Sequence, residues 1–260
     1  MKSKRIQEKK QIITIFLILG LIFATVFIYS FQIEYQNRRN NIKIMTWNIH
    51  KGVGIDGEFD LNRIIKEIKE NQIDIAGLQE LEEDIAKEIA DKLDMEYYFG
   101  ADFDDNEGNA ILSKHPIKEV ENIYLAPDDE RSLIKAEIVI NSEKWDVFIT
   151  HLSLRNRENN LEQVEHILSK VLKGYTQNVI LLGDFNFEPE SEQYKKIINH
   201  DNPKLIDTYH ILNEDSGLTF RTTFLFRRID YIFCSSDLKP ILSEVIYSQA
   251  SDHCAVLTTF

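Results

Sequence analysis

The sequence predicts an α/β domain in which two sheets pack together and are flanked by helices. Short β-branched and aliphatic runs alternate along the chain with segments whose apolar residues recur at helical spacing. Residues 97–149 contain successive strand-like runs separated by turns, a pattern typical of antiparallel strands. The roughly 220 residues after position 40 show no internal repeat and suit one large domain with a substantial core. Mixed strands with interspersed helices favour this layered arrangement.

The first elements are a strand at 42–47 and a helix at 61–69, where Asp60 is placed to cap the helix. A buried strand follows at 73–78. Apolar residues at positions 81, 85, 89 and 93 then predict a helix over 81–93. Four further strands are predicted, at 109–112, 117–124, 133–140 and 144–149.

The second half begins with a predicted helix over 157–172, which has one apolar side and Gly174 as its terminator. A short aliphatic strand at 178–182 and a helix at 192–198 come next. The remaining predicted strands are 229–233, 241–247 and 255–259.

The N-terminal segment predicts a membrane anchor. Residues 12–31 are apolar, uncharged and about long enough to span a bilayer. Residues 1–11 contain five basic side chains and one acidic one, which predicts a cytoplasmic tail. We then expect a linker at 32–40 and a globular domain at 41–260 on the extracytoplasmic side of the cell membrane. A cleaved signal peptide is the alternative, but the apolar run is long for one and no small-x-small cleavage site is clear.

The domain is strongly acidic. The chain has a formal net charge of −13, and its first forty residues hold seven basic and two acidic side chains, which leaves the rest at −18. Proteins that bind nucleic acid stably usually do so through Lys and Arg, so stable nucleic-acid binding is not expected. A nuclease that binds its substrate in a local basic groove is the alternative interpretation. The same charge disfavours broad adhesion to an anionic bilayer, which favours an anchor.

The chain has two cysteines, Cys234 and Cys254. A domain outside the cell permits a disulfide between them, and two buried free thiols are the alternative. Their spacing does not match a cysteine zinc site.

Polar residues recur where apolar runs end. Taken alone, each of these residues can be explained as a turn former or a helix cap. Together they supply carboxylates, amides and imidazoles, which can bind a hard cation, neutralise developing charge and move a proton. This set predicts metal-assisted phosphoester hydrolysis and comprises Asn48, Glu80, His151, Asp184, Asn186, Asp252 and His253.

The motifs resemble the endonuclease/exonuclease/phosphatase superfamily, whose members share the pancreatic-deoxyribonuclease fold. The resemblance covers nearly all of residues 41–260. It implies a four-layer α/β sandwich, one active site at the rim of two sheets, and dependence on Mg²⁺, with Mn²⁺ or Ca²⁺ as alternatives. The motifs appear in order as Thr46-Trp47-Asn48-Ile49-His50, Leu78-Gln79-Glu80, Gly108-Asn109-Ala110-Ile111-Leu112-Ser113, Thr150-His151-Leu152, Gly183-Asp184-Phe185-Asn186, Arg228-Ile229-Asp230-Tyr231-Ile232-Phe233 and Ser251-Asp252-His253.

The resemblance also implies roles for single residues. Glu80 resembles the principal metal ligand, Asn48 its neighbour, and Asp252 a further ligand. Asp184 and Asn186 resemble the pair that orients the attacking water and holds the phosphate.

Two histidines receive roles in the same way. His253 resembles a catalytic base or a phosphate-stabilising imidazole, and Asp230 resembles the carboxylate that orients an active-site histidine. His151 is similar to its counterpart in the deoxyribonuclease, sphingomyelinase and phosphatase branches.

Three residues are expected to contact substrate. Asn109 lies in one of the motifs, and Arg131 occupies a position where similar sequences often have arginine, although a surface ion pair is the alternative. Arg155 precedes Arg157 by two residues, and such guanidiniums suit bidentate phosphate contact. A solvated helix start explains Arg155 equally well.

These inferences predict a membrane-anchored, magnesium-dependent phosphoesterase that hydrolyses a phosphodiester, such as a lipid headgroup or another substrate near the membrane. An anchored extracellular nuclease is one alternative. A catalytically silent binding module is another, and the complete set of polar groups speaks against it. The sequence indicates no protein partner.

Overall fold

A computed structural model provides the three-dimensional structure of the chain. Ile42–Phe260 form one compact unit. The predicted tail at 1–11 and linker at 32–40 lie outside the described residues, as does most of the predicted anchor at 12–31. Among the residues that are described, no helix is long and apolar enough to cross a membrane. The structure describes residues 19, 20, 22, 23, 25, 41–102, 106–126, 129–221 and 226–260.

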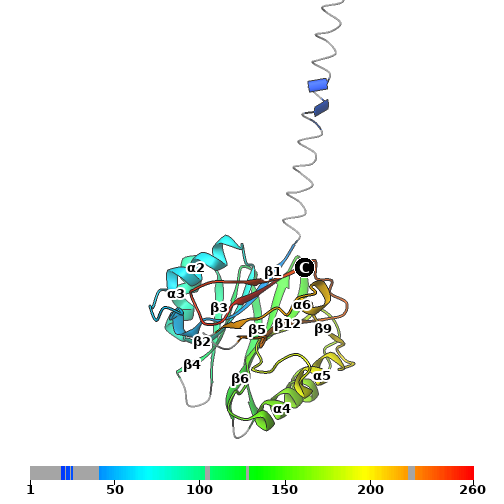
Figure 1. Cartoon of the computed structure of the whole chain (residues 1–260). Coiled ribbons are helices and arrows are strands. Elements are labelled where there is room, and N and C mark those ends of the chain that lie inside the picture. The colour runs from blue at the N-terminus through cyan, green and yellow to red at the C-terminus, as the bar shows by residue number, and fades with distance from the viewer. Residues whose placement is uncertain are drawn as a thin grey trace, which may run out of the picture. The chain divides into compact units, whose positions relative to one another are not determined.

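Two six-stranded mixed sheets form the centre of the domain (Figure 1). The first has the order β13-β14-β1-β2-β4-β3, in which only β1 and β2 run parallel. Its strands are β13 (Leu242–Ile246), β14 (Ala255–Thr259), β1 (Lys43–Asn48), β2 (Ile75–Glu82), β4 (Glu107–Ser113) and β3 (Glu96–Ala101).

The second sheet has the order β5-β6-β7-β8-β12-β9, in which only β7 and β8 run parallel. A short hairpin of β10 (Phe220–Arg221) and β11 (Phe226–Arg227) stands apart from both sheets. The strands of the second sheet are β5 (Ile117–Ala126), β6 (Asp129–Ile140), β7 (Glu143–His151), β8 (Val179–Asp184), β12 (Asp230–Ser235) and β9 (Leu205–Asp207).

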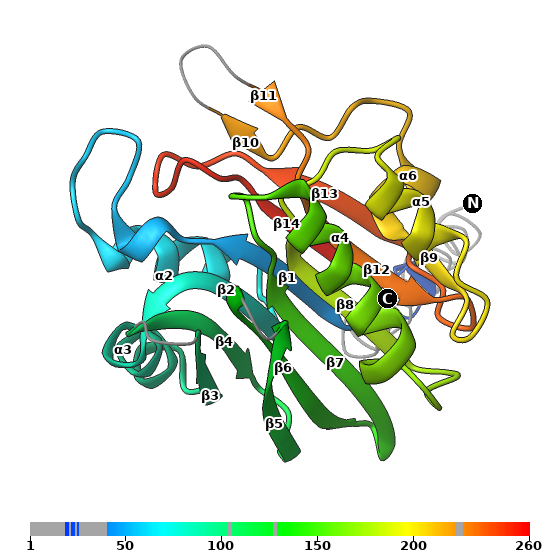
Figure 2. The same cartoon turned by 90° about the horizontal axis from the view of Figure 1, so that it is seen from below.

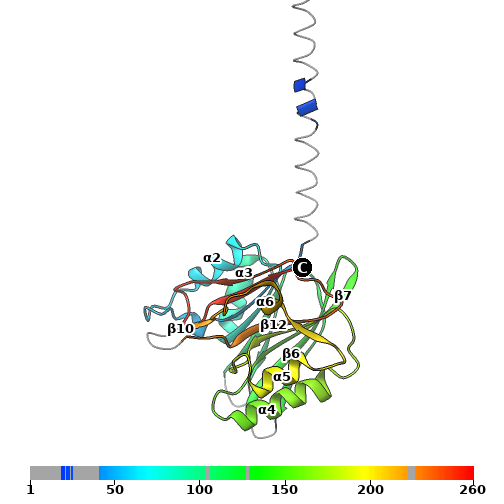
Figure 3. The same cartoon turned by 45° about the vertical axis from the view of Figure 1, so that its right-hand side comes forward.

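Helices cover the outer face of each sheet, which gives a helix–sheet–sheet–helix order (Figures 2 and 3). The first sheet packs against α2 (Leu61–Glu70) and α3 (Glu83–Leu93). Asp60 caps α2 as predicted, because its Oδ1 accepts the Asn62 N–H at 2.9 Å. The second sheet packs against α4 (Arg157–His166), the π-helical turn η2 (Ile167–Val171) and α5 (Glu192–Ile198). Two short helices complete the domain, η1 (His50–Gly52) and α6 (Thr208–Leu212).

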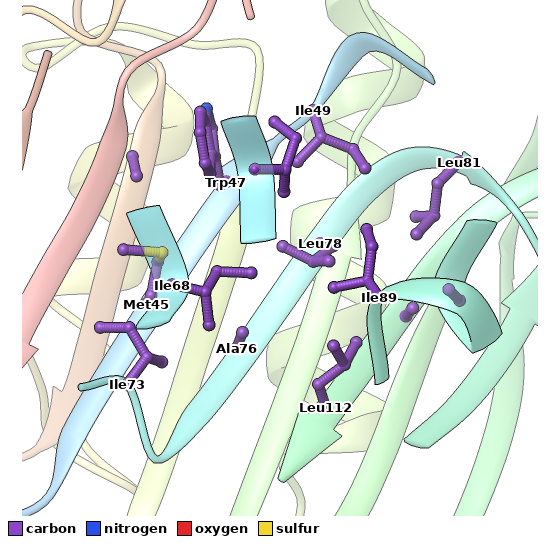
Figure 4. Packing of buried hydrophobic residues seen from close by; sticks show 14 of the residues in the cluster. Met45, Trp47, Ile49, Ile68, Ile73, Ala76, Leu78, Leu81, Ile89 and Leu112 are labelled. Carbon is purple, nitrogen blue, oxygen red and sulfur yellow. The ribbon is translucent and has the colours of Figure 1, made fainter. Parts of the chain in front are cut away.

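Alternation along the strands divides the core into layers, because successive side chains point to opposite faces. On β1, Met45 and Trp47 point to the helices and pack with Ile68 and Ile89 (Figure 4). Ile44 points the other way and joins the layer between the sheets. The burial of both faces explains why the predicted strands read as nearly continuous apolar runs.

Gly77 on β2 lets the two sheets approach each other closely. A Cβ atom there would clash with the Leu182 side chain and would lie 3.0 Å from Ile149 Cγ1. A larger residue at this position would therefore push β2 away from β7 and β8, the strands that present the polar groups described below.

The predicted elements are present, with local differences. β2 continues to Glu82, past the predicted helix start at position 81, because Leu81 pairs with Gly108 after a bulge. Helical spacing of apolar residues did not reveal that bulge. The sequence also did not predict β3, β9, β10, β11 or α6, of which all but β3 have five residues or fewer.

Cys234 and Cys254 are both buried, and no disulfide joins them. Burial raises the pKa of the Cys234 thiol to about 12, because the thiolate would lose its hydration. Buried cysteines without a disulfide are therefore the correct alternative.

Candidate active site

The predicted site residues meet at one rim of the two sheets. Asn48 ends β1 and Glu80 lies near the end of its parallel neighbour β2. His151 and Asp184 end the parallel strands β7 and β8 and stand opposite each other in register. Asp230 begins the antiparallel strand β12 and pairs with Asp184. Parallel strands that end together therefore bring these distant residues to one place.

Asn48 links the two sheets. Its Nδ2 donates to Glu80 Oε1 at 2.9 Å and to Asp184 Oδ2 at 3.1 Å. Its Oδ1 accepts the backbone N–H of His50 at 3.1 Å. One amide therefore fixes a carboxylate from each sheet.

The backbone at Glu80 aims its carboxylate at the rim. The bulge between Gln79 and Leu81 gives Glu80 a φ of 55°, a backbone conformation that residues other than glycine rarely adopt. The Glu80 side chain is 29% exposed, whereas the other carboxylates of the site, those of Asp184 and Asp230, are almost fully buried. Of these three carboxylates, Glu80 is thus the one that solvent reaches most easily.

Asp184 lies between two imidazoles. His151 Nε2 is 3.6 Å and His253 Nε2 is 3.7 Å from Asp184 Oδ2. Burial raises the pKa of Asp184 to about 7, and the neighbouring Asp230 charge acts in the same direction. Asp184 is therefore suited to exchange a proton near neutral pH.

His253 is held by Asp230. Its Nδ1 lies 3.0 Å and 3.2 Å from the two Asp230 oxygens. Burial opposes protonation of the ring, but the carboxylates of Asp230 and Asp184 outweigh it and raise the pKa of His253 to about 10. The Phe220 ring packs 4.8 Å from the imidazole. His253 is thus an oriented, positively charged group.

His151 belongs to a second chain of contacts. Arg131 Nη1 lies 3.2 Å from His151 Nδ1 and 3.0 Å from Asp102 Oδ2. Because a guanidinium only donates, Nδ1 accepts and the neutral ring carries its proton on Nε2, which faces Asp184. Burial and the Arg131 charge lower the pKa of His151, which keeps the ring neutral. Sequence reasoning missed Asp102, because no local pattern distinguishes it.

The Gly-Asp-Phe-Asn motif has a steric reason. A Cβ at Gly183 would run into the Thr150 carbonyl of β7, so only glycine lets β8 pair this closely at its end. Asn186 has a φ of 53°, and its backbone N–H donates to Asp184 Oδ1 at 3.0 Å. The Asn186 Nδ2 donates to the Leu152 carbonyl at 3.0 Å. The motif therefore aims Asp184 and ties the turn to β7.

Three predicted residues make none of the contacts described above. Asn109 is wholly buried, and its Nδ2 donates to the Ser132 carbonyl at 3.4 Å. Arg155 is exposed just before α4 and forms no hydrogen bond or ion pair with other described residues. Asp252 is 32% exposed, with its Oδ1 3.9 Å from His50 Nδ1. The structure brings the other predicted site residues together.

Two groups of donors could hold a divalent cation. Asp184, Asp230 and His253 each offer a ligand atom, and these atoms lie within 4.8 Å of one another. Glu80 offers a partly exposed carboxylate that shares the Asn48 amide with Asp184. Carboxylate and amide oxygens are the donors that Mg²⁺, Mn²⁺ and Ca²⁺ take in proteins, so the chemistry of the site fits a hard cation.

Comparison with known proteins agrees with this geometry. The model of the endonuclease/exonuclease/phosphatase family matches residues 45–253. The uncharacterised protein YbhP of Escherichia coli is 24% identical over 249 residues, which cover 84% of this chain and 95% of YbhP.

Solved structures share the fold. The mannosyl-6-phosphatase of Bacteroides thetaiotaomicron superposes with a TM-score of 0.72 at 20% identity, over 84% of this chain and 98% of that one. The 2',3'-cyclic phosphatase ANGEL2 gives a TM-score of 0.72 at 18% identity, over 85% and 95%. Since the family model matches most of the chain and its motifs meet at one rim, the chain belongs to the endonuclease/exonuclease/phosphatase family, as a metal-dependent phosphoesterase.

Proposed function

We propose that the chain hydrolyses a phosphodiester by attack of water, with Mg²⁺ as the assisting cation. The observation that supports this most directly is the Asn48 amide, which bonds Glu80 of one sheet and Asp184 of the other at 2.9 Å and 3.1 Å. This bridge places an accessible carboxylate beside a buried carboxylate that titrates near neutrality. Metal-assisted hydrolysis of a phosphoester needs both kinds of group.

Glu80 is the residue proposed to hold the cation. Mg²⁺ keeps several waters, so it suits a carboxylate that solvent reaches. The buried trio of Asp184, Asp230 and His253 suits it less, because both Asp230 oxygens already face the His253 ring. Asn48 supports Glu80 through Nδ2 and would ligate the cation itself only with its amide turned over. Asp252 is proposed as a further ligand from the outer rim. When bound, the cation would neutralise charge on the phosphate.

Asp184 and His253 are proposed to divide the proton and charge roles. Asp184, with a pKa of about 7, is suited to orient the water and accept its proton. His253, protonated by virtue of Asp230, is suited to stabilise the negative charge of the phosphate in the transition state. Asn186 is proposed to hold the phosphate beside them.

His151 and Arg131 are proposed to contact the phosphate oxygens. The His151 Nε2–H points into the site, and the Arg131 side chain is 29% exposed while it bonds Asp102. Arg155, four residues beyond His151 and exposed, is proposed to reach the substrate farther out. Asn109, buried against β6, is proposed to act by supporting the neighbourhood of Arg131.

The proposed substrate lies at or near a membrane, with the domain held on the extracytoplasmic side by the predicted anchor at 12–31. The basic tail and uncharged apolar run support this placement. The charge of −18 on the rest of the chain opposes long nucleic acids as substrates.

A substrate panel tests the function. The full chain in detergent is assayed with Mg²⁺ against phospholipid diesters, small phosphodiesters, phosphomonoesters and plasmid DNA. Hydrolysis of diesters that stops on chelation is expected. Rapid DNA cleavage with inert lipids would support an anchored nuclease instead, and no hydrolysis of any ester would support a silent binding module.

The location has its own test. Protease added to intact cells is expected to degrade the domain, and the tail with its anchor is expected to stay in the membrane fraction. Protection of the domain in intact cells would contradict the proposed orientation.

A further inference from the structure

A pocket of about 770 Å³ opens beside the candidate active site. It lies between the loop after η1, the residue that starts β11, and the segment that joins β13 to β14. Its volume falls within the range of small-molecule sites. Of the residues that line it, Asp252 belongs to the proposed metal site, whereas the others lie outside the proposed catalytic groups.

The pocket shares that inner wall with the catalytic cluster. Ser251 and Asp252 line it, and Ser251 Oγ donates to the Asn48 carbonyl at 2.8 Å and accepts the His253 N–H at 3.1 Å. His50, which also lines the pocket, donates its N–H to Asn48 Oδ1. A group in the pocket would therefore lie next to a phosphate held by the cluster.

The outer wall is apolar. Ile55, Phe226 and Tyr247 line it, and these residues are 58%, 52% and 60% exposed. Large apolar side chains that gather with such exposure around a concave surface mark a binding site more often than single exposed ones do. The domain as a whole is acidic. An anionic group in the pocket would be disfavoured, and an uncharged apolar one favoured.

The pocket is preformed. The Ile55 N–H donates to the Gln249 carbonyl at 3.1 Å, which ties the two loops across it. Arg63 Nη1 binds Asp56 Oδ2 at 2.8 Å and secures the loop to α2. A substituent would enter without first ordering these loops, which reduces the entropic cost of binding.

We infer that this pocket binds an uncharged alkyl substituent of the phosphodiester. The inference rests on the proposed function and narrows its substrate class to amphiphilic phosphodiesters. Specificity then comes from apolar contact beside the phosphate rather than from a second charged group.

The test compares two esters with one leaving group, methyl 4-nitrophenyl phosphate and octyl 4-nitrophenyl phosphate. Both are kept below the concentration at which the octyl ester forms micelles. The wild-type chain is expected to favour the octyl ester by about tenfold or more in kcat/KM, since even one methylene in an apolar pocket is worth about tenfold. The double variant Ile55→Ser, Phe226→Ser is expected to lose this preference and to keep its rate on the methyl ester.

Ile241→Ser is the matched control, because Ile241 is 61% exposed and lies at the other end of β13 from Tyr247. This variant is expected to keep the preference. Equal rates on both esters in the wild type, or a preference retained by the double variant, would overturn the inferred role of the pocket while leaving the proposed function intact. Failure of the wild type to hydrolyse either ester with a divalent cation would overturn the proposed function and this inference together.

Discussion

Replacement of Asp230 by asparagine isolates the electrostatic support of His253. The substitution removes one charge but keeps the size and shape of a side chain that is wholly buried. Both Asp230 oxygens now face His253 Nδ1, at 3.0 Å and 3.2 Å. An amide loses the attraction that keeps the ring protonated, and it can donate to Nδ1 and reverse the tautomer.

The size of the effect follows from those contacts. A hydrogen bond to a charged group contributes about 1.5–3 kcal/mol. Since about 1.36 kcal/mol corresponds to tenfold in rate, its loss alone lowers kcat by about tenfold to 150-fold. A reversed tautomer costs up to about 10⁴-fold in other histidine–aspartate pairs. The expected decrease in kcat for Asp230→Asn is therefore at least about tenfold and at most about 10⁴-fold.

The assay is steady-state hydrolysis of a chromogenic phosphodiester with Mg²⁺, together with thermal unfolding of each variant. Asp146→Asn is the matched control, because Asp146 is also buried but lies toward the opposite end of β7 from His151. The control is expected to keep its kcat. A folded Asp230→Asn protein with wild-type kcat would refute the role of the His253–Asp230 pair.

Three further predictions concern other contacts. Glu80→Gln is expected to raise the Mg²⁺ concentration for half-maximal activity by about tenfold or more, because it removes the accessible ligand charge, and a metal titration with unchanged half-saturation would contradict this. Asp102→Asn is expected to lower kcat about tenfold, because it weakens the contact that holds Arg131, although Asp102 itself is too buried to meet substrate. Steady-state kinetics measure this effect, and an unaltered kcat would contradict a role for the Asp102–Arg131–His151 contacts. Asp207→Ala is expected to lower the free energy of unfolding by about 3–5 kcal/mol, because the Asp207 carboxylate pairs with Arg228, 6% exposed, and the charge would be left unpaired. Urea unfolding measures this loss, and a decrease below about 1 kcal/mol would contradict it.

The sequence predicted most of the fold, because the domain buries both faces of its sheets. Aliphatic runs such as those of β1 and β8 are unmistakable when inward and outward residues are both apolar. β9, with three residues, and β10 and β11, with two each, are too short to give such a signal. These strands form because neighbouring elements supply hydrogen-bond partners and shield them from solvent. A local sequence pattern does not indicate such tertiary contacts.

Chemistry at the strand ends was also visible in the sequence. The order of motifs and their residue types predicted the family, and Asn48, Glu80, His151 and Asp184 each stood at the end of an apolar run. A shared site was inferred from their common position at strand ends, where sites are commonly built.

Only the tertiary structure decided how those groups bond and titrate. The Asn48 bridge spans 136 residues of sequence, and the relay from Asp102 through Arg131 to His151 joins three strand ends or loops. The protonation states of Asp184 and His253 depend on burial and on neighbouring charges, which distant segments supply. The sequence determined which residue types the site contains, because local patterning sets strands and their ends. Distances, accessibility and proton affinities had to come from the fold, because each depends on segments far apart in the chain.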